Sequence, residues 1–234
     1  MPYPSDSNVS SSSTCGCTTS CSYSSYPIRY SNGEIREVRP ALPIRGYGQD
    51  WGHNLSYGNR IDSLYDGCNG CNWFVKEFPQ AGKDASGNIA VFGIINDAIW
   101  FNKSGGNYIA RFFGKETLSE DATNKEFIFT DTRGQVFKFF NYDAAIPTAK
   151  QGQFKSVTDP YGNVWTPTYD GNNRVTDFVM GSSPSVGYYY TYYTSGENSG
   201  QLQYVTLKQG TTNLRRIEYQ FYGSGDSNGA SLAG

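Results

Sequence analysis

Residues 157–179 read VTDPYGNVWTPTYDGNNRVTDFV, and this stretch decides the fold class. Asp159-Pro160-Tyr161-Gly162-Asn163 is a turn sequence: the proline presets its φ, the glycine accepts a positive φ, and the aspartate side chain accepts nearby backbone N–H groups. Residues 170–173 (DGNN) form a second turn sequence. Residues 164–169 and 174–179 are rich in β-branched and aromatic side chains, which favour strands. The stretch therefore predicts a β-hairpin, which is marginal alone and is stabilised by pairing with neighbouring strands.

Two observations indicate that this hairpin is repeated. The pair Tyr169-Asp170 has an earlier copy at Tyr142-Asp143. A second phrase starts at Gly152, at Asn173 and at Gly200, and each copy leads into a strand-like sequence. Self-similarity at a period of 20–50 residues is typical of sheets or solenoids built from stacked units. The residues expected to build the repeat turns are Asp159, Pro160, Gly162, Asn163, Tyr169, Asp170 and Arg174.

The rest of the chain supports an all-β fold with three segments. Residues 1–25 are a Ser- and Cys-rich stretch of low complexity, which predicts a disordered tail. Residues 26–130 alternate short apolar runs with turn signals, which predicts a β-rich entry segment. Residues 131–234 are predicted to form an antiparallel sheet of stacked hairpin repeats. Within the entry segment, residues 118–125 are expected to form at most a short helical turn.

Composition agrees with this prediction and argues against several kinds of partner. The chain has 19 Tyr, 14 Phe and 27 Gly, and only 17% of its residues are charged. Its net charge of −2, with no run of Lys or Arg, argues against nucleic acid and against an anionic membrane surface. No stretch approaches the ~20 apolar residues that a spanning helix needs. No signal peptide is visible, so a piece of a longer precursor, another export route and an intracellular location all stay open beside the expected extracellular or cell-surface location.

The motifs resemble a known repeat. Val157–Asn163, followed by Tyr169-Asp170 and Asn173-Arg174-Val175, closely resembles the YD repeat of the RHS family, which includes bacterial polymorphic-toxin shells, insecticidal toxin-complex shells and the animal teneurins. Pro27–Glu34 and Gly48–Asn54 are similar to the entry segment that often precedes such repeats. The resemblance covers roughly residues 26–234 and is strongest at 152–179.

The resemblance implies a scaffold and not an enzyme. In longer relatives the sheet spirals into a hollow shell around a cargo polypeptide, whereas about three repeats are too few to enclose a cavity. The resemblance therefore implies that the YD-type hairpin repeats of residues 131–234 form an open curved sheet or partial shell. Relatives that cleave themselves carry the segment Asp-Pro-x-Gly-Leu. Here Asn163 follows Gly162 in the middle of the chain, so this activity is not carried over.

The cysteines leave three interpretations open. Their spacing is C-x-C-x3-C near the N-terminus and C-x2-C further on, at Cys15, Cys17, Cys21, Cys68 and Cys71. Disulfides with one cysteine left over fit an extracellular setting. A structural zinc site, with Cys68 and Cys71 meeting two thiolates of the tail, fits the C-x2-C turn. Free thiols are the third interpretation, and no other cofactor is expected.

The aromatic strand at residues 188–193 (YYYTYY) suggests a second functional class. Full burial of Tyr188, Tyr190 and Tyr192 would leave a structural scaffold or adhesion segment. A solvent-facing row of these rings, with Trp165, would favour a carbohydrate-binding module. An enzyme is the third and most distant hypothesis, since the chain has a single histidine, His53, and no nucleophile motif near it.

The last strand-like sequence, residues 216–222 (RIEYQFY), predicts an exposed sheet edge. Unpaired backbone groups at an edge attract further strands. The expected partners are therefore the chain's own C-terminal continuation or further copies of the chain. Replacing Tyr219 with Pro is expected to abolish this association by removing one N–H group.

Overall fold

The computed structural model describes residues 28, 35–45, 50–59, 66–93, 98–181 and 185–222. Strands make up 56% and helix 4% of the structure, and the sheets are antiparallel and open, so the all-β prediction is confirmed. Two short 3-10 helices, η2 (Arg111–Phe113) and η3 (Thr148–Lys150), are described. Within the described ranges, no helix has the length and apolar character needed to cross a membrane.

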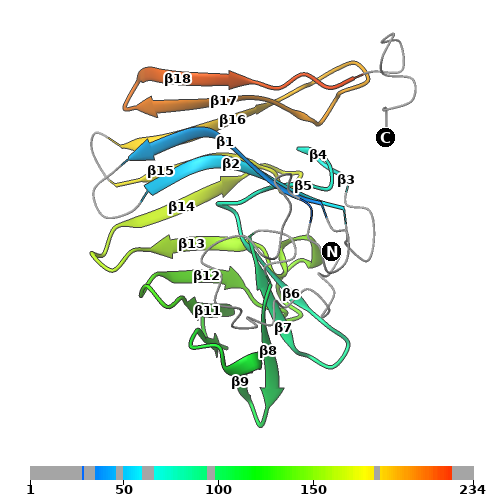
Figure 1. The fold of residues 1–234 in the computed structure, drawn as a ribbon, viewed down its shortest axis with the longest axis vertical. Helices are drawn as coiled ribbons and strands as arrows, with labels where there is room; N and C mark the ends of the chain where they lie inside the picture. Colours follow the sequence, from blue (N-terminus) through cyan, green and yellow to red (C-terminus); the bar gives the residue numbers. More distant parts are fainter. Residues whose placement is uncertain are drawn as a thin grey trace.

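One large sheet contains most of the strands (Figure 1). It comprises β6 (Gln80–Lys83), β7 (Ile89–Phe92), β8 (Ile99–Ser104), β9 (Asn107–Ala110), β10 (Thr117–Asp121), β11 (Glu126–Thr130), β12 (Val136–Phe140), β13 (Phe154–Thr158), β14 (Val164–Tyr169), β15 (Val175–Met180), β16 (Val186–Tyr192), β17 (Leu202–Gln209) and β18 (Thr212–Glu218). Each strand pairs with the next in sequence, so the sheet is a 13-stranded meander. Because β11 pairs with β12, the sheet runs unbroken across the segment boundary predicted at residues 130–131.

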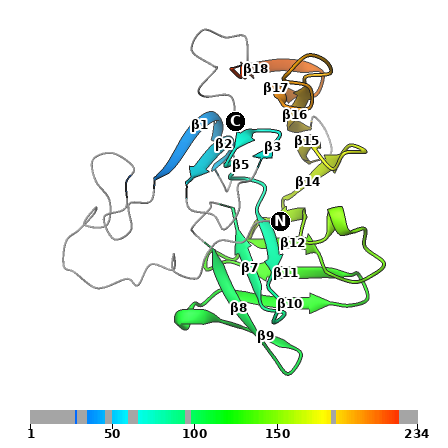
Figure 2. The same ribbon diagram turned by 90° about the vertical axis from the view of Figure 1, so that its right-hand side faces the viewer.

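A second, smaller sheet lies against one face of the large one (Figure 2). It consists of β1 (Arg36–Arg45), β2 (Asp50–Gly58) and β5 (Trp73–Val75), in that order. A two-stranded ribbon, β3 (Asp66–Gly67) and β4 (Gly70–Cys71), precedes β5. We call the face of the large sheet that the small sheet contacts the inner face.

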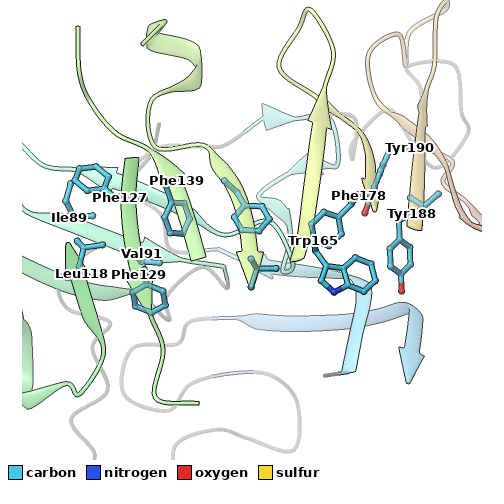
Figure 3. Packing of buried hydrophobic residues seen from close by; sticks show 14 of the residues in the cluster. Ile89, Val91, Leu118, Phe127, Phe129, Phe139, Trp165, Phe178, Tyr188 and Tyr190 are labelled. Carbon is cyan, nitrogen blue, oxygen red and sulfur yellow. The ribbon is translucent and has the colours of Figure 1, made fainter. Parts of the chain in front are cut away.

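The main hydrophobic core lies on the inner face (Figure 3). Side chains of successive strands form a continuous apolar row because neighbouring strands are paired in register and residues two apart point to the same side. The fully buried rings in this row are Phe101, Phe127, Phe139, Phe154, Phe178 and Tyr188. Burying each such ring contributes about 1.5–3 kcal/mol to folding.

The predicted turns have the expected geometry. In the loop of residues 159–163, both Tyr161 and Asn163 donate their backbone N–H groups to Asp159 Oδ1, at 2.9 and 2.8 Å. Gly162 has a φ of +86°, which only glycine adopts without strain. Loops with the same pair of bonds to the first aspartate occur at residues 84–88, 131–135 and 170–174. The repeated turn therefore also occurs at residues 84–88, upstream of the predicted repeat region.

The predicted repeat phrase also occupies equivalent positions. Gly152, Asn173 and Gly200 all have positive φ, and each stands two residues before a strand: β13, β15 and β17. The helical turn expected at residues 118–125 is wrong for half of that range: residues 122–125 form a turn, but residues 118–121 lie in β10. Leu118 is buried there opposite Phe129 of β11, and this pairing outweighs the weak local preference.

The two edges of the large sheet differ. The β6 edge reaches back to the start of β13: Ala81 donates its N–H to the Gly152 carbonyl at 2.9 Å, and the Tyr142 hydroxyl donates to the Ala81 carbonyl at 2.7 Å. The predicted strand at residues 216–222 is shifted, since β18 covers Thr212–Glu218. Within the part of the chain that the structure describes, β18 pairs with β17 alone.

Candidate functional site on the inner face

The small sheet is attached to the large one through polar contacts as well as apolar packing. Tyr188 of β16 donates its hydroxyl to the Leu42 carbonyl of β1 at 2.8 Å, and both residues are buried. The Leu42 side chain joins the main core. Because the acceptor is a main-chain carbonyl, this bond holds β1 without requiring a particular side chain on that strand.

His53 of β2 is enclosed between two tyrosines of the large sheet. Its Nε2 lies 2.8 Å from the Tyr219 hydroxyl, and its Nδ1 lies 3.4 Å from the Tyr190 hydroxyl. Both rings meet the imidazole edge to face. Burial lowers the pKa of His53 to about 3, so the ring is neutral at ordinary pH. This geometry makes His53 part of the contact between the two sheets.

Glu77 binds the residue of β2 that follows His53. Its carboxylate accepts the backbone N–H of Asn54 at 2.9 Å and also the Asn54 side-chain amide. Burial raises the pKa of Glu77 to about 7, although the two bonds from Asn54 favour the charged form. The carboxyl group therefore changes its charge near neutral pH at the contact between the two sheets.

A cavity of about 550 Å³ lies beside this contact, at the ends of β14 to β17. Residues 68–80 form one wall, and the Asp170 loop with the loop before β17 forms another. The cavity brings together five residues that sequence analysis selected for different reasons: Cys68, Tyr169, Arg174, Tyr190 and Tyr192. Cavities of this size are in the range of small-molecule sites.

Arg174 is held in the cavity wall by three interactions. It forms an ion pair with Asp170, with Nη2 and Oδ2 2.7 Å apart. Its Nη1 donates to the Gly200 carbonyl at 3.2 Å, and its guanidinium stacks over the Tyr192 ring at 4.3 Å. The predicted repeat-turn role of Asp170 and Arg174 thus extends to joining the β14–β15 hairpin to the β16–β17 hairpin.

Tyrosine hydroxyls at the strand ends are also used within the sheet. Tyr169 donates to the Phe154 carbonyl and Tyr192 to the Val175 carbonyl, both at 2.7 Å. Tyr142 makes the corresponding bond to Ala81. The tyrosine of each Tyr-Asp pair therefore forms a side-chain hydrogen bond to the main chain of another segment. Tyr192 forms the same kind of bond, although no aspartate follows it.

The cysteine hypotheses stay predictions. Cys15, Cys17 and Cys21, like the side chain of Cys71, lie outside the described residues. Burial raises the pKa of the Cys68 thiol, and a hydrogen bond with Tyr192 opposes this shift. Among the described residues, no group of three or more His, Cys, Asp or Glu side chains is arranged to hold a metal ion.

The hypothesis of an exposed aromatic platform, which the sequence left open, is wrong. Tyr188 and Tyr190 are 0% and 7% exposed because the small sheet covers them. Trp165, 6% exposed, stacks on Phe178 with ring centroids 5.3 Å apart. Tyr192 is half-buried beneath Arg174. No solvent-facing row of these four rings exists for a sugar to stack on.

Sequence analysis missed Asn54, Glu77 and Gln153. Gln153 lines the cavity and donates its side-chain amide to the Asn173 carbonyl at 3.0 Å. Asn54 and Gln153 lie in motifs that the sequence analysis quoted, but those motifs do not indicate the contacts, since the partners lie 20 or more residues away. The turn at residues 84–88 was also missed, although the sequence marks it: Asp84–Asn88 and Asp159–Asn163 share the pattern Asp-x-x-Gly-Asn.

Comparison with known proteins adds no family assignment: no family model matches the chain, and no curated protein matches it significantly.

Proposed function

We propose that this protein is a non-enzymatic structural scaffold, a segment of an RHS/YD-repeat-like sheet whose inner face holds polypeptide. One observation carries the proposal: a 13-stranded open meander keeps a separate three-stranded segment on its aromatic inner face. The Tyr188–Leu42 bond shows how this is done, through a main-chain carbonyl.

The chemistry of the contact supports a holding role. Apolar rings and backbone-directed hydroxyls bind polypeptide with little demand on its sequence. The titratable groups on this face have partners suited to structure: His53 lies between two tyrosine hydroxyls, and Glu77 binds Asn54. A scaffold needs a rigid face of this kind and no reactive group.

A scaffold built from repeats also needs a sheet edge to which further strands can be added. The β18 edge supplies it, but the substitution suggested by the sequence, Tyr219→Pro, is unsuitable. The Tyr219 N–H donates to the Gln203 carbonyl at 2.9 Å, so it lies inside the sheet. Inward and outward N–H groups alternate along an antiparallel strand. The register therefore directs the N–H of Ile217 inward and that of Arg216 outward.

The test is sedimentation velocity over a range of concentrations with matched variants. We expect the wild-type chain to associate, Arg216→Pro to remain monomeric because its outward N–H is lost, and Arg216→Ala to associate like the wild type. Ile217→Pro is the control for damage to the sheet and should lower the melting temperature. A wild-type chain that stays monomeric throughout, or an Arg216→Pro variant that associates equally well, contradicts the extension of this edge.

A further inference from the structure

We propose that the cavity at the ends of β14 to β17 is a binding site for a neutral sugar ring. This site is distinct from the scaffold function and does not depend on it. It also differs from an exposed aromatic platform, because the binding groups line a half-open cavity of about 550 Å³.

The cavity lining is rich in carboxamide side chains. Each carboxamide offers two N–H donors and a carbonyl acceptor. Sugar hydroxyls likewise donate and accept, so a ring of carboxamides matches a polyol in both directions. Six such side chains line the cavity: Asn69, Gln80, Gln153, Asn172, Asn173 and Gln201.

Gln153 supplies the most specific observation. The bond from its Nε2 to the Asn173 carbonyl fixes the orientation of the carboxamide, which identifies the remaining atom as the acceptor Oε1. This oxygen is buried and has no hydrogen-bond partner among the described residues. A buried acceptor without a donor is costly. Gln153 lines the cavity, so a sugar hydroxyl bound there would supply the donor that Oε1 lacks.

The aromatic residues of the lining offer apolar surface in place of hydroxyls. The Tyr169 and Tyr192 hydroxyls are engaged by main-chain carbonyls, and the Tyr190 hydroxyl lies against His53. Phe78 packs edge to face on Tyr190, with ring centroids 5.5 Å apart. The lining thus combines carboxamides with apolar rings, which suit the polar edge and the C–H face of a pyranose respectively.

Charge selects the class of sugar. Among the described lining residues there is no Asp or Glu, so a cationic ligand would have no counter-charge. Arg174 is the cation of the lining, and its ion pair with Asp170 already neutralises it. An anionic sugar would have to compete with Asp170, whereas a neutral sugar needs no change in the cavity wall.

The test is isothermal titration calorimetry on the full chain at about 10 mM ligand, a concentration suited to millimolar dissociation constants. The probes are glucose, galactose, mannose and N-acetylglucosamine, with glucuronate as the charged comparison. We expect at least one neutral sugar to bind. Gln153→Leu and Gln80→Leu should weaken binding at least tenfold, while Gln209→Leu, at the far end of β17, should leave it unchanged.

Near-ultraviolet circular dichroism of each variant separates lost binding from lost structure. The proposal is overturned if no neutral sugar binds, if glucuronate binds as well as its neutral counterpart, or if both cavity variants bind like the wild type. Should Gln153→Leu unfold, Gln80→Leu alone decides the matter. None of these outcomes affects the sedimentation test of the scaffold.

Discussion

The ionisation of Glu77 should govern how the stability of this protein depends on pH near neutrality. We consider the substitution Glu77→Gln, which keeps an acceptor for Asn54 but cannot ionise. The groups around it are His53, Lys76, Tyr188, Tyr190 and Tyr219. Burial raises the pKa values of the three tyrosines, so they stay protonated across the relevant range.

The direction of the effect follows from the two shifted pKa values. Glu77 has its pKa raised from 4.5 to about 7, so the folded state holds this proton more tightly than the unfolded state. Its contribution to stability is complete below pH 4.5 and is lost as the pH rises through about 7. His53 has its pKa lowered from 6.5 to about 3, so stability falls as the pH decreases below 6.5. Between pH 4.5 and 6.5 the two slopes oppose each other and cancel.

The magnitude follows from about 1.4 kcal/mol per pKa unit. The shift of Glu77 corresponds to at most about 3.5 kcal/mol, and partial solvent contact reduces this to roughly 2 kcal/mol. The wild type should therefore show a plateau between pH 4.5 and 6.5 and lose stability above it. Glu77→Gln should keep gaining stability up to pH 6.5 and retain it at higher pH.

The assay is urea unfolding followed by intrinsic fluorescence at several pH values from 4.5 to 8. The quantity to compare is the difference in unfolding free energy between Glu77→Gln and the wild type, because the contribution of His53 cancels in it. We expect this difference to rise by roughly 2 kcal/mol from pH 4.5 to 8 in favour of the variant. Glu116→Gln, one residue before β10 and away from the contact between the two sheets, is the control and should give a constant difference. A constant difference for Glu77→Gln would refute the reasoning.

Four further substitutions test the repeat geometry, each by thermal or urea unfolding. Gly152→Ala should cost more than about 3 kcal/mol, because its φ is +75° and its Cβ would lie 2.1 Å from the Ala81 carbonyl oxygen. Gly162→Ala, with a φ of +86° but open space around it, should cost only about 1 kcal/mol, and an equal cost at both sites would contradict the close approach at Gly152. Asp159→Ala removes the acceptor of the turn and should cost about 1–2 kcal/mol; no change would show that the turn sequence suffices. Phe178→Ala, at the centre of the core, should cost about 3–5 kcal/mol, and a much smaller loss would mean that the small sheet collapses into the gap.

The local parts of the fold were predictable because their causes are local. The turn at residues 159–163 depends on one aspartate, one proline and one glycine, all inside five residues. The strands β14 and β15 follow from the β-branched and aromatic residues between two such turns. The strand β10 was not predicted, because Leu118 gains its burial from Phe129 on the next strand and not from its own neighbours.

The candidate site was only half predictable, for a reason that Tyr188 and Tyr190 illustrate. Alternation along β16 places both rings on one face and Tyr189 on the other, and this follows from the sequence. Which face is covered does not follow, since the cover comes from β1 and β2, more than a hundred residues earlier in the chain. The same docking gives Glu77 its shifted pKa and His53 its neutral ring, so neither property belongs to a motif. In this sheet the repeated turns determine the framework, and the segment that contains β1 and β2 determines which aromatic rings of β16 are buried.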